Sequence, residues 1–122
     1  MLGRSIAAFV ALVTASAANA QWVPGMEIYE QDVQVLSNGV LNTVHFRRDG
    51  TATISSSTGA TVVDATWNTN DGKLCLKTAS TSDCYPYQLP FTARMPVDLT
   101  SDCGVQSRWT ALATGVMPGE RG

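Results

Sequence analysis

The chain contains little of what enzymes and nucleic-acid-binding proteins rely on. It has one histidine, three cysteines and 15% charged residues, and its formal net charge is −2. The largest basic cluster is the pair Arg47-Arg48, which falls far short of the basic surface that phosphate binding needs. These shortages argue against a nucleic-acid partner.

Catalytic and metal-binding motifs are also missing. The sequence has no Gly-Lys-Ser/Thr phosphate loop, no Gly-x-Ser-x-Gly elbow and no paired zinc-type Cys/His spacing. Asn68 to Gly72 resembles the start of a calcium loop, but Lys73 and Ala79 stand at the positions that need glycine and a bidentate acid. No motif supplies His45 with the partner that general-base chemistry requires. The sequence thus predicts no metal, cofactor or catalytic residue, and it favours a protein that is not an enzyme.

The longest apolar run lies near the N-terminus. Arg4 precedes the run Ile6 to Val13, and Ala18-Asn19-Ala20 supplies a small-x-small cleavage site before Gln21. The run is too short to span a bilayer. We therefore expect residues 1–20 to be a secretory signal peptide and the mature protein to be periplasmic or secreted, without a membrane span. Residues 21–112 are then expected to form a single domain, and 113–122 a flexible tail.

Turn signals recur at intervals of roughly 8 to 13 residues between positions 37 and 83, a spacing typical of short antiparallel strands. The signals are Ser37-Asn38-Gly39, Asp49-Gly50, Ser57-Thr58-Gly59, Asn70-Asp71-Gly72 and Thr81-Ser82-Asp83. The segments between them alternate in polarity: Val63, Ala65 and Trp67, for example, fall on one side of a predicted strand. We predict an all-β fold, an antiparallel meander of about six to eight strands forming a small barrel or sandwich.

Two segments are harder to interpret. Residues 26–36 fit either a helical turn or two or, towards their end, a strand. Between residues 91 and 104, Pro96 and Asp102 break any period, and a last strand carrying Trp109 is expected only after that segment.

The three cysteines bear on the stability of such a small domain, because thiols of an exported chain tend to pair. A hairpin with Cys75 opposite Cys84 would allow one disulfide and leave Cys103 as a free thiol, through which the protein could dimerise. The same hairpin aligns four large side chains on its other face, namely Leu74, Leu76, Tyr85 and Tyr87. Bridges from Cys103 to Cys75 or to Cys84 stay open as alternatives.

Four aromatic residues are candidate ligand contacts, because small-molecule pockets favour aromatic walls. They are Trp67, Tyr85, Tyr87 and Trp109. Packing in the core is the alternative for all four, and a domain of this size favours it.

Residues 44–84 resemble a recurrent bacterial pattern. The string Val44 to Thr51, then Ala65-Thr66-Trp67, Asp71 to Cys75 and finally Cys84 is similar to small, exported, uncharacterised β-domains with the signature Asp-Gly-Thr, Gly-x-Trp, Asp-Gly-x-Leu-Cys and a second cysteine. Ala65 stands where that signature has glycine. The resemblance implies a meander that closes towards a lipocalin-like barrel, and it implies no activity.

A second resemblance is to periplasmic inhibitors of secreted metalloproteases, which are small barrels with one disulfide and an N-terminal segment that enters the protease. Gln21 to Pro24 would be that segment. Three functions are therefore carried forward: a non-catalytic binding or inhibitor module, with a small apolar ligand or a protein as partner; a structural or envelope-associated protein without a ligand; and a hydrolase with an unrecognised site. The first is favoured.

Overall fold

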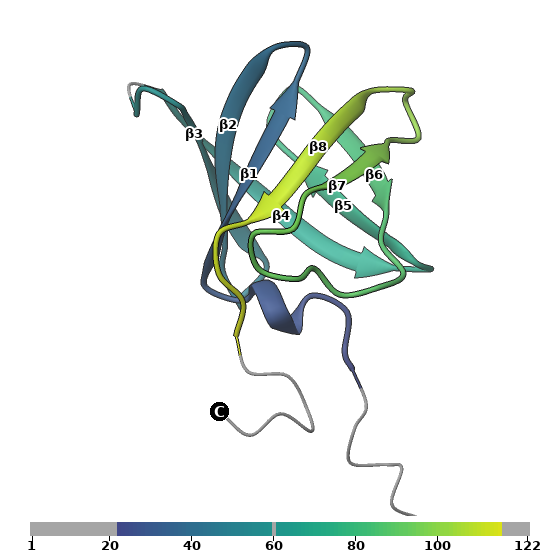
Figure 1. Ribbon diagram of the computed structural model, residues 1–122. Helices are drawn as coiled ribbons and strands as arrows, with labels where there is room; N and C mark the ends of the chain where they lie inside the picture. The colour runs from purple at the N-terminus through teal and green to yellow at the C-terminus, as the bar shows by residue number, and fades with distance from the viewer. Residues whose placement is uncertain (1–21, 60, 116–122) are drawn as a thin grey trace, which may run out of the picture.

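A computed structural model describes residues 22–59 and 61–115. Over these residues, eight antiparallel strands form one nearly closed, barrel-like sheet in the order β6-β5-β4-β3-β2-β1-β8-β7 (Figure 1). The elements are η2 (Met26–Ile28), β1 (Gln31–Ser37), β2 (Val40–Phe46), β3 (Thr51–Ser56), β4 (Val62–Asn70), β5 (Lys73–Lys77), β6 (Ser82–Pro86), β7 (Val97–Thr100) and β8 (Gln106–Ala111). The all-β prediction is confirmed. The expected signal peptide, Gln21 and residues 116–122 lie outside the described residues.

Tight turns connect β1 to β2 and β4 to β5 because the sequence places residues that tolerate positive φ there. Asn38 and Gly39 join β1 to β2 with φ of 53° and 77°, and Asp71 and Gly72 join β4 to β5 with φ of 53° and 74°. Two successive positive φ values match the right-handed twist of the flanking strands, which is why Asn-Gly and Asp-Gly favour such hairpins. The predicted turns thus set the register of the meander locally.

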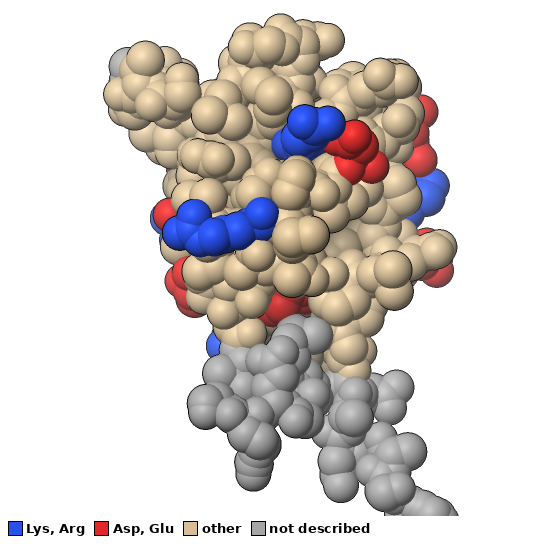
Figure 2. Space-filling view, in the orientation of Figure 1, with Lys and Arg blue, Asp and Glu red and all other residues tan. Residues whose placement is uncertain are grey.

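The inner face of the barrel holds the apolar residue of each alternating pair. Val44 and Phe46 of β2, for example, are buried, whereas His45 between them lies on the outer face. The buried apolar residues are Ile28, Val33, Val44, Phe46, Ala52, Ala65, Trp67, Leu74, Tyr87, Phe91, Trp109 and Ala111. On the face seen in Figure 2, charged side chains are scattered among neutral ones. None of the described helices has the length and apolarity that a membrane crossing needs.

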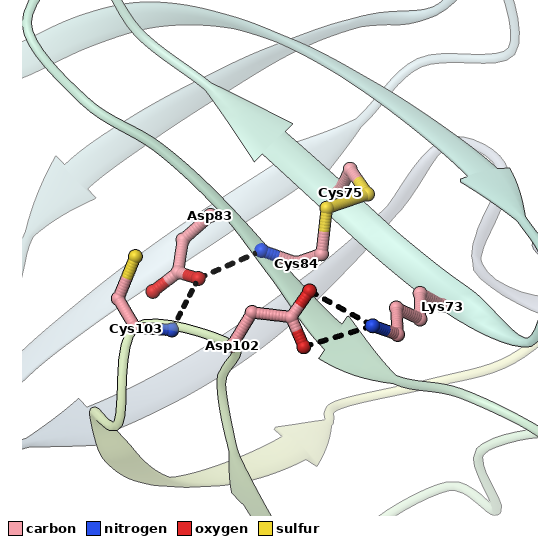
Figure 3. The surroundings of a disulfide bond; sticks show 6 residues. All are labelled: Lys73, Cys75, Asp83, Cys84, Asp102 and Cys103. Carbon is pink, nitrogen blue, oxygen red and sulfur yellow. Dashed lines mark hydrogen bonds and ion pairs between the residues drawn. A yellow bond between two sulfur atoms is a disulfide. The ribbon is translucent and has the colours of Figure 1, made fainter.

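β6 and β7 are the two ends of the sheet, and we call the line where they meet the seam. The backbone N–H of Asp102, after β7, donates to the carbonyl of Cys84 at 2.9 Å. The backbone N–H of Cys103 donates to Asp83 Oδ1 at 3.1 Å (Figure 3). Lys73 Nζ adds contacts of 2.9 Å to both carboxylate oxygens of Asp102. These contacts connect β6 to the residues that follow β7 and so help to close the barrel.

β7 was not predicted, because it lies within the segment whose polarity showed no period. Its four residues are set by pairing with β8, in which Val97 faces Trp109 and Leu99 faces Ser107. The ambiguous segment 26–36 turns out to contain both alternatives, the short 3-10 turn η2 followed by strand β1.

The disulfide joins Cys75 and Cys84, as the hairpin pairing predicted. The two residues are directly opposite in the β5–β6 register, with Cα atoms 4.0 Å apart. Leu74 pairs with Tyr85 on the inner face, so the sulfur atoms lie on the outer face. Cys103 is an exposed free thiol. This bond closes a short loop and links β5 covalently to β6, the strand at the edge of the sheet next to the seam.

Candidate ligand-binding site

The two ends of the barrel differ. One end, which we call the base, is covered by η2 and the loop between β6 and β7 (Figure 1). The other, the open end, holds a cavity of about 200 Å³ whose wall comes from β1, β2, β3, β5, β6 and β8. Its lining residues are Val35, Ser37, Asn42, Val44, Ile54, Leu76, Thr78, Thr81, Asp83, Tyr85 and Trp109. An apolar wall with a few polar groups at its rim is the usual composition of a small-molecule site.

Two of the predicted aromatic contacts meet at this cavity. The rings of Tyr85 and Trp109 have centroids 4.8 Å apart, and Trp109 also stacks against Phe46 at 6.4 Å and Phe91 at 6.0 Å. The indole N–H of Trp109 donates to Ser107 Oγ at 2.8 Å, which satisfies its one donor and fixes the ring. The cavity therefore has a rigid aromatic wall.

The other two predicted aromatic contacts, Trp67 and Tyr87, lie in the base. Trp67 packs edge-on against Phe46 with centroids 4.9 Å apart and donates from Nε1 to the carbonyl of Arg47 at 2.9 Å. A Cβ at Gly25 would stand 2.9 Å from the Trp67 ring, and Gly25 has φ of +96°, so the chain needs glycine there. The structure thus brings together only half of the predicted aromatic set.

A buried carboxylate organises the base, and the sequence offered no motif that marks it. Glu27 is fully buried and accepts hydrogen bonds from Trp22 Nε1 at 2.9 Å, the Tyr87 hydroxyl at 2.5 Å and the backbone N–H of Phe91 at 2.7 Å. The Tyr87 oxygen in turn accepts from the N–H of Gly25 at 2.9 Å. This network holds the N-terminal segment and the β6–β7 loop against the barrel.

The same network keeps Tyr87 protonated. Burial raises the pKa of the Tyr87 hydroxyl, and its hydrogen bond to Glu27 and the charge of that carboxylate raise it further. Ionising Tyr87 would place two negative charges side by side in a buried site. The groups of the base therefore have a structural role.

Asp83 brings a charge to the rim of the cavity. Because Asp83 pairs with inward-facing Leu76, its side chain belongs to the inner side of β6. Burial opposes ionisation of this carboxyl, but hydrogen bonds from Ser101, Cys103 and the backbone of Cys84 outweigh that effect and lower its pKa. Asp83 therefore presents a fixed negative charge beside the seam.

The free thiol of Cys103 is held in its protonated form. Its hydrogen bond to Asp83 and the negative charge of that carboxylate raise the thiol pKa. Because the thiolate is the reactive species in disulfide exchange, this position disfavours rapid reaction of Cys103, although the thiol is exposed.

His45 has partners that sequence motifs did not indicate. Cross-strand pairing sets it opposite Asp32, so that Nδ1 lies 2.7 Å from Asp32 Oδ1, while Nε2 lies 3.5 Å from Glu30 Oε1. This cluster is on the outer face of β2, whereas the cavity is inside the barrel. No group of histidine, cysteine and acidic residues in the described parts of the chain is arranged to hold a metal.

Three other hollows among the described residues are larger. One, of about 480 Å³, follows the β1–β2 turn and the β7–β8 hairpin and contains the exposed Asp98–Arg108 ion pair. Another, of about 450 Å³, opens at the seam between the β6–β7 loop and β7, where core-facing residues such as Tyr87, Phe91 and Leu99 line it. The third, of about 320 Å³, lies over β4 and the residues that follow β5. Six strands contribute to the cavity at the open end, which is the least open to solvent of these four. This lower exposure favours that cavity as the site, because small-molecule pockets bury most of the surface of their ligand.

Fold and site define a small antiparallel β-barrel with one disulfide and one open end. No protein-family model, curated protein or solved structure matches this chain.

Proposed function

We propose that this protein is a non-catalytic binding module that takes a small, largely apolar molecule into the open end of its barrel. The observation that carries the proposal is the cavity itself, with aliphatic walls, the Tyr85–Trp109 pair on one side and hydroxyl and amide groups at the rim. Apolar walls supply the driving force, and the few polar groups orient the ligand.

The size of the cavity limits the ligand to about one ring. An apolar cavity of about 150 Å³ accepts benzene, and this one measures about 200 Å³. Long-chain lipids would have to extend out of the open end into water.

The N-terminal arm supports ligand binding over protease inhibition. Trp22 packs edge-on against Tyr87 with centroids 5.4 Å apart and donates its N–H to Glu27. The largest side chain of the arm is thus used to cover the base and is not free to enter a partner. Val23 and Pro24 are exposed.

Filling the cavity tests the proposal. Benzyl alcohol titrated into the protein by calorimetry is expected to bind, and Ile54→Trp is expected to abolish binding because the larger side chain occupies the cavity. Thr53→Trp is the matched control: it adds the same side chain one residue earlier, on the outer face of β3. Binding that survives Ile54→Trp, with both variants folded by circular dichroism, would contradict the proposal.

We also propose that the chain is exported. The expected cleavage site before Gln21 and the Cys75–Cys84 bond support this location, because disulfides persist in oxidising compartments. N-terminal sequencing of protein recovered from the periplasm or medium should begin at Gln21. A product that retains Met1 in the cytoplasm would contradict it.

A further inference from the structure

The electrostatics of the open end narrow the ligand class, on the condition that the proposed binding function holds. Of the described residues that line the cavity, Asp83 is the one that carries a charge. The others are aliphatic, aromatic, hydroxyl or amide side chains, so the carboxylate sets the sign of the potential inside. A bound anion would meet this charge across a partly dehydrated space, where screening is weak.

Within residues 22–59 and 61–115, no cation is paired with this carboxylate. The nearby Lys73 is engaged by both oxygens of Asp102 on the outer side of the seam (Figure 3). Asp83 instead receives neutral donors, with the N–H of Cys84 at 2.9 Å and that of Cys103 at 3.1 Å. These bonds hold the carboxylate in place and leave its charge uncompensated.

The aromatic wall favours the same sign of ligand. The faces of tryptophan and tyrosine rings attract cations through their quadrupole, by about 0.5–2 kcal/mol depending on desolvation. Tyr85 lies two residues from Asp83 on the same side of β6 and pairs closely with Trp109. Trp109 is 1% exposed and stacks against Phe46 and Phe91, so a cation at the rim would lie between the carboxylate of Asp83 and the ring of Tyr85.

From these contacts we infer that the open end binds a small organic cation: an amine whose ammonium group lies near Asp83 and whose apolar body, about the size of one ring, lies against Val44, Ile54 and Trp109. The same arrangement selects against carboxylates and phosphates, which separates this site from a fatty-acid pocket.

Three probes of nearly equal size test the inference. Benzylamine, benzyl alcohol and benzoate are titrated into the protein by calorimetry at pH 7 and low salt. Benzylamine is expected to bind about tenfold more tightly than benzyl alcohol, and benzoate is expected to bind most weakly. Added salt is expected to reduce the difference in affinity between benzylamine and benzyl alcohol. Equal binding of amine and alcohol, or tighter binding of benzoate, overturns the cation inference and leaves the proposed function standing. If none of the three binds, the proposed function itself fails.

Variants test whether Asp83 is the source of the preference for benzylamine. Asp83→Asn is expected to remove the advantage of benzylamine while benzyl alcohol still binds, and Asp102→Asn is the matched control because its carboxylate faces outward at the same seam. Ser37→Lys keeps the seam contacts and adds a positive charge to the rim, so it should weaken benzylamine alone. If Ser37→Lys and Asp83→Asn both leave the amine preference unchanged, Asp83 is not its source.

Discussion

The base and the open end of this barrel use similar residue types in opposite ways. In the base, Trp22, Tyr87 and the carboxylate of Glu27 satisfy one another, and the carboxylate accepts three hydrogen bonds in all. At the open end, Tyr85 and Asp83 line a cavity, and none of the ion pairs of the described residues gives Asp83 a counter-ion. Polar and aromatic groups that are fully paired stabilise a fold, whereas groups that are left facing a cavity are available to a ligand.

The two ends of the barrel also differ in the sequence separation of the residues that contact one another. Tyr87 and Phe91 contact a residue that precedes them by 60 and 64 positions, so the base ties the start of the described chain to its later part. Most of the cavity wall, by contrast, comes from strands that pair with their neighbours in sequence. We therefore expect substitutions in the base to affect stability most and substitutions at the open end to affect binding.

Glu27→Ala should give the largest loss of stability. It leaves the hydroxyl of Tyr87, the indole N–H of Trp22 and the backbone N–H of Phe91 without their acceptor in a buried site, at a cost of about 3–5 kcal/mol. Urea unfolding followed by circular dichroism measures it. Glu30→Ala, which removes an exposed carboxylate three residues away, is the control and should cost much less. If Glu27→Ala lowered the free energy of unfolding no more than Glu30→Ala, the hydrogen bonds of the base would not be a main source of stability.

Removing the disulfide should have the next largest effect. Replacing Cys75 and Cys84 together by alanine frees a loop with a sequence separation of 9, and the chain-entropy model assigns such a bond about 2–3 kcal/mol. The readout is again the free energy of unfolding. Non-reducing peptide mapping of the native protein provides the companion measurement: a linked 75–84 peptide and an alkylatable Cys103 are expected, and a bridge that contains Cys103 would contradict the structure.

Alkaline pH should destabilise the base, that is, the covered end of the barrel. The pKa of Tyr87 is raised in the folded protein, so the unfolded chain loses this proton first, once the pH exceeds about 10. The stability that depends on neutral Tyr87 is therefore present below that pH and declines above it. Tyr87→Phe should be less stable at neutral pH, where it loses the bond to Glu27, and should show a shallower decline above pH 10. Parallel declines for both proteins would show that Tyr87 does not carry the effect.

The smallest effect is expected at the outer surface of the seam. Lys73→Ala removes a half-exposed ion pair with Asp102, and such pairs contribute about 0.2–1 kcal/mol. The loss should shrink further in high salt. A cost above that of removing the disulfide would indicate that the ion pair, and not the backbone contact of Asp102 with Cys84, closes the barrel.

The sequence by itself was enough for the local features of this fold. Turn residues at positions 38–39 and 71–72 and the alternation along β2 and β4 predicted the meander, because both depend on the conformation of neighbouring residues. The pairing of Cys75 with Cys84 followed from the same short-range register. β7 escaped prediction because its pairing with β8, and not its own pattern, makes it a strand.

Only the tertiary structure decided which candidate residues share a site. Alternation indicates which side of a strand a residue faces, but its depth inside a barrel depends on how the strands are staggered around the whole ring. That stagger places Tyr85 and Trp109 at the cavity and Trp67 and Tyr87 in the base. The burial of Glu27 likewise depends on partners far along the chain, which no local pattern encodes.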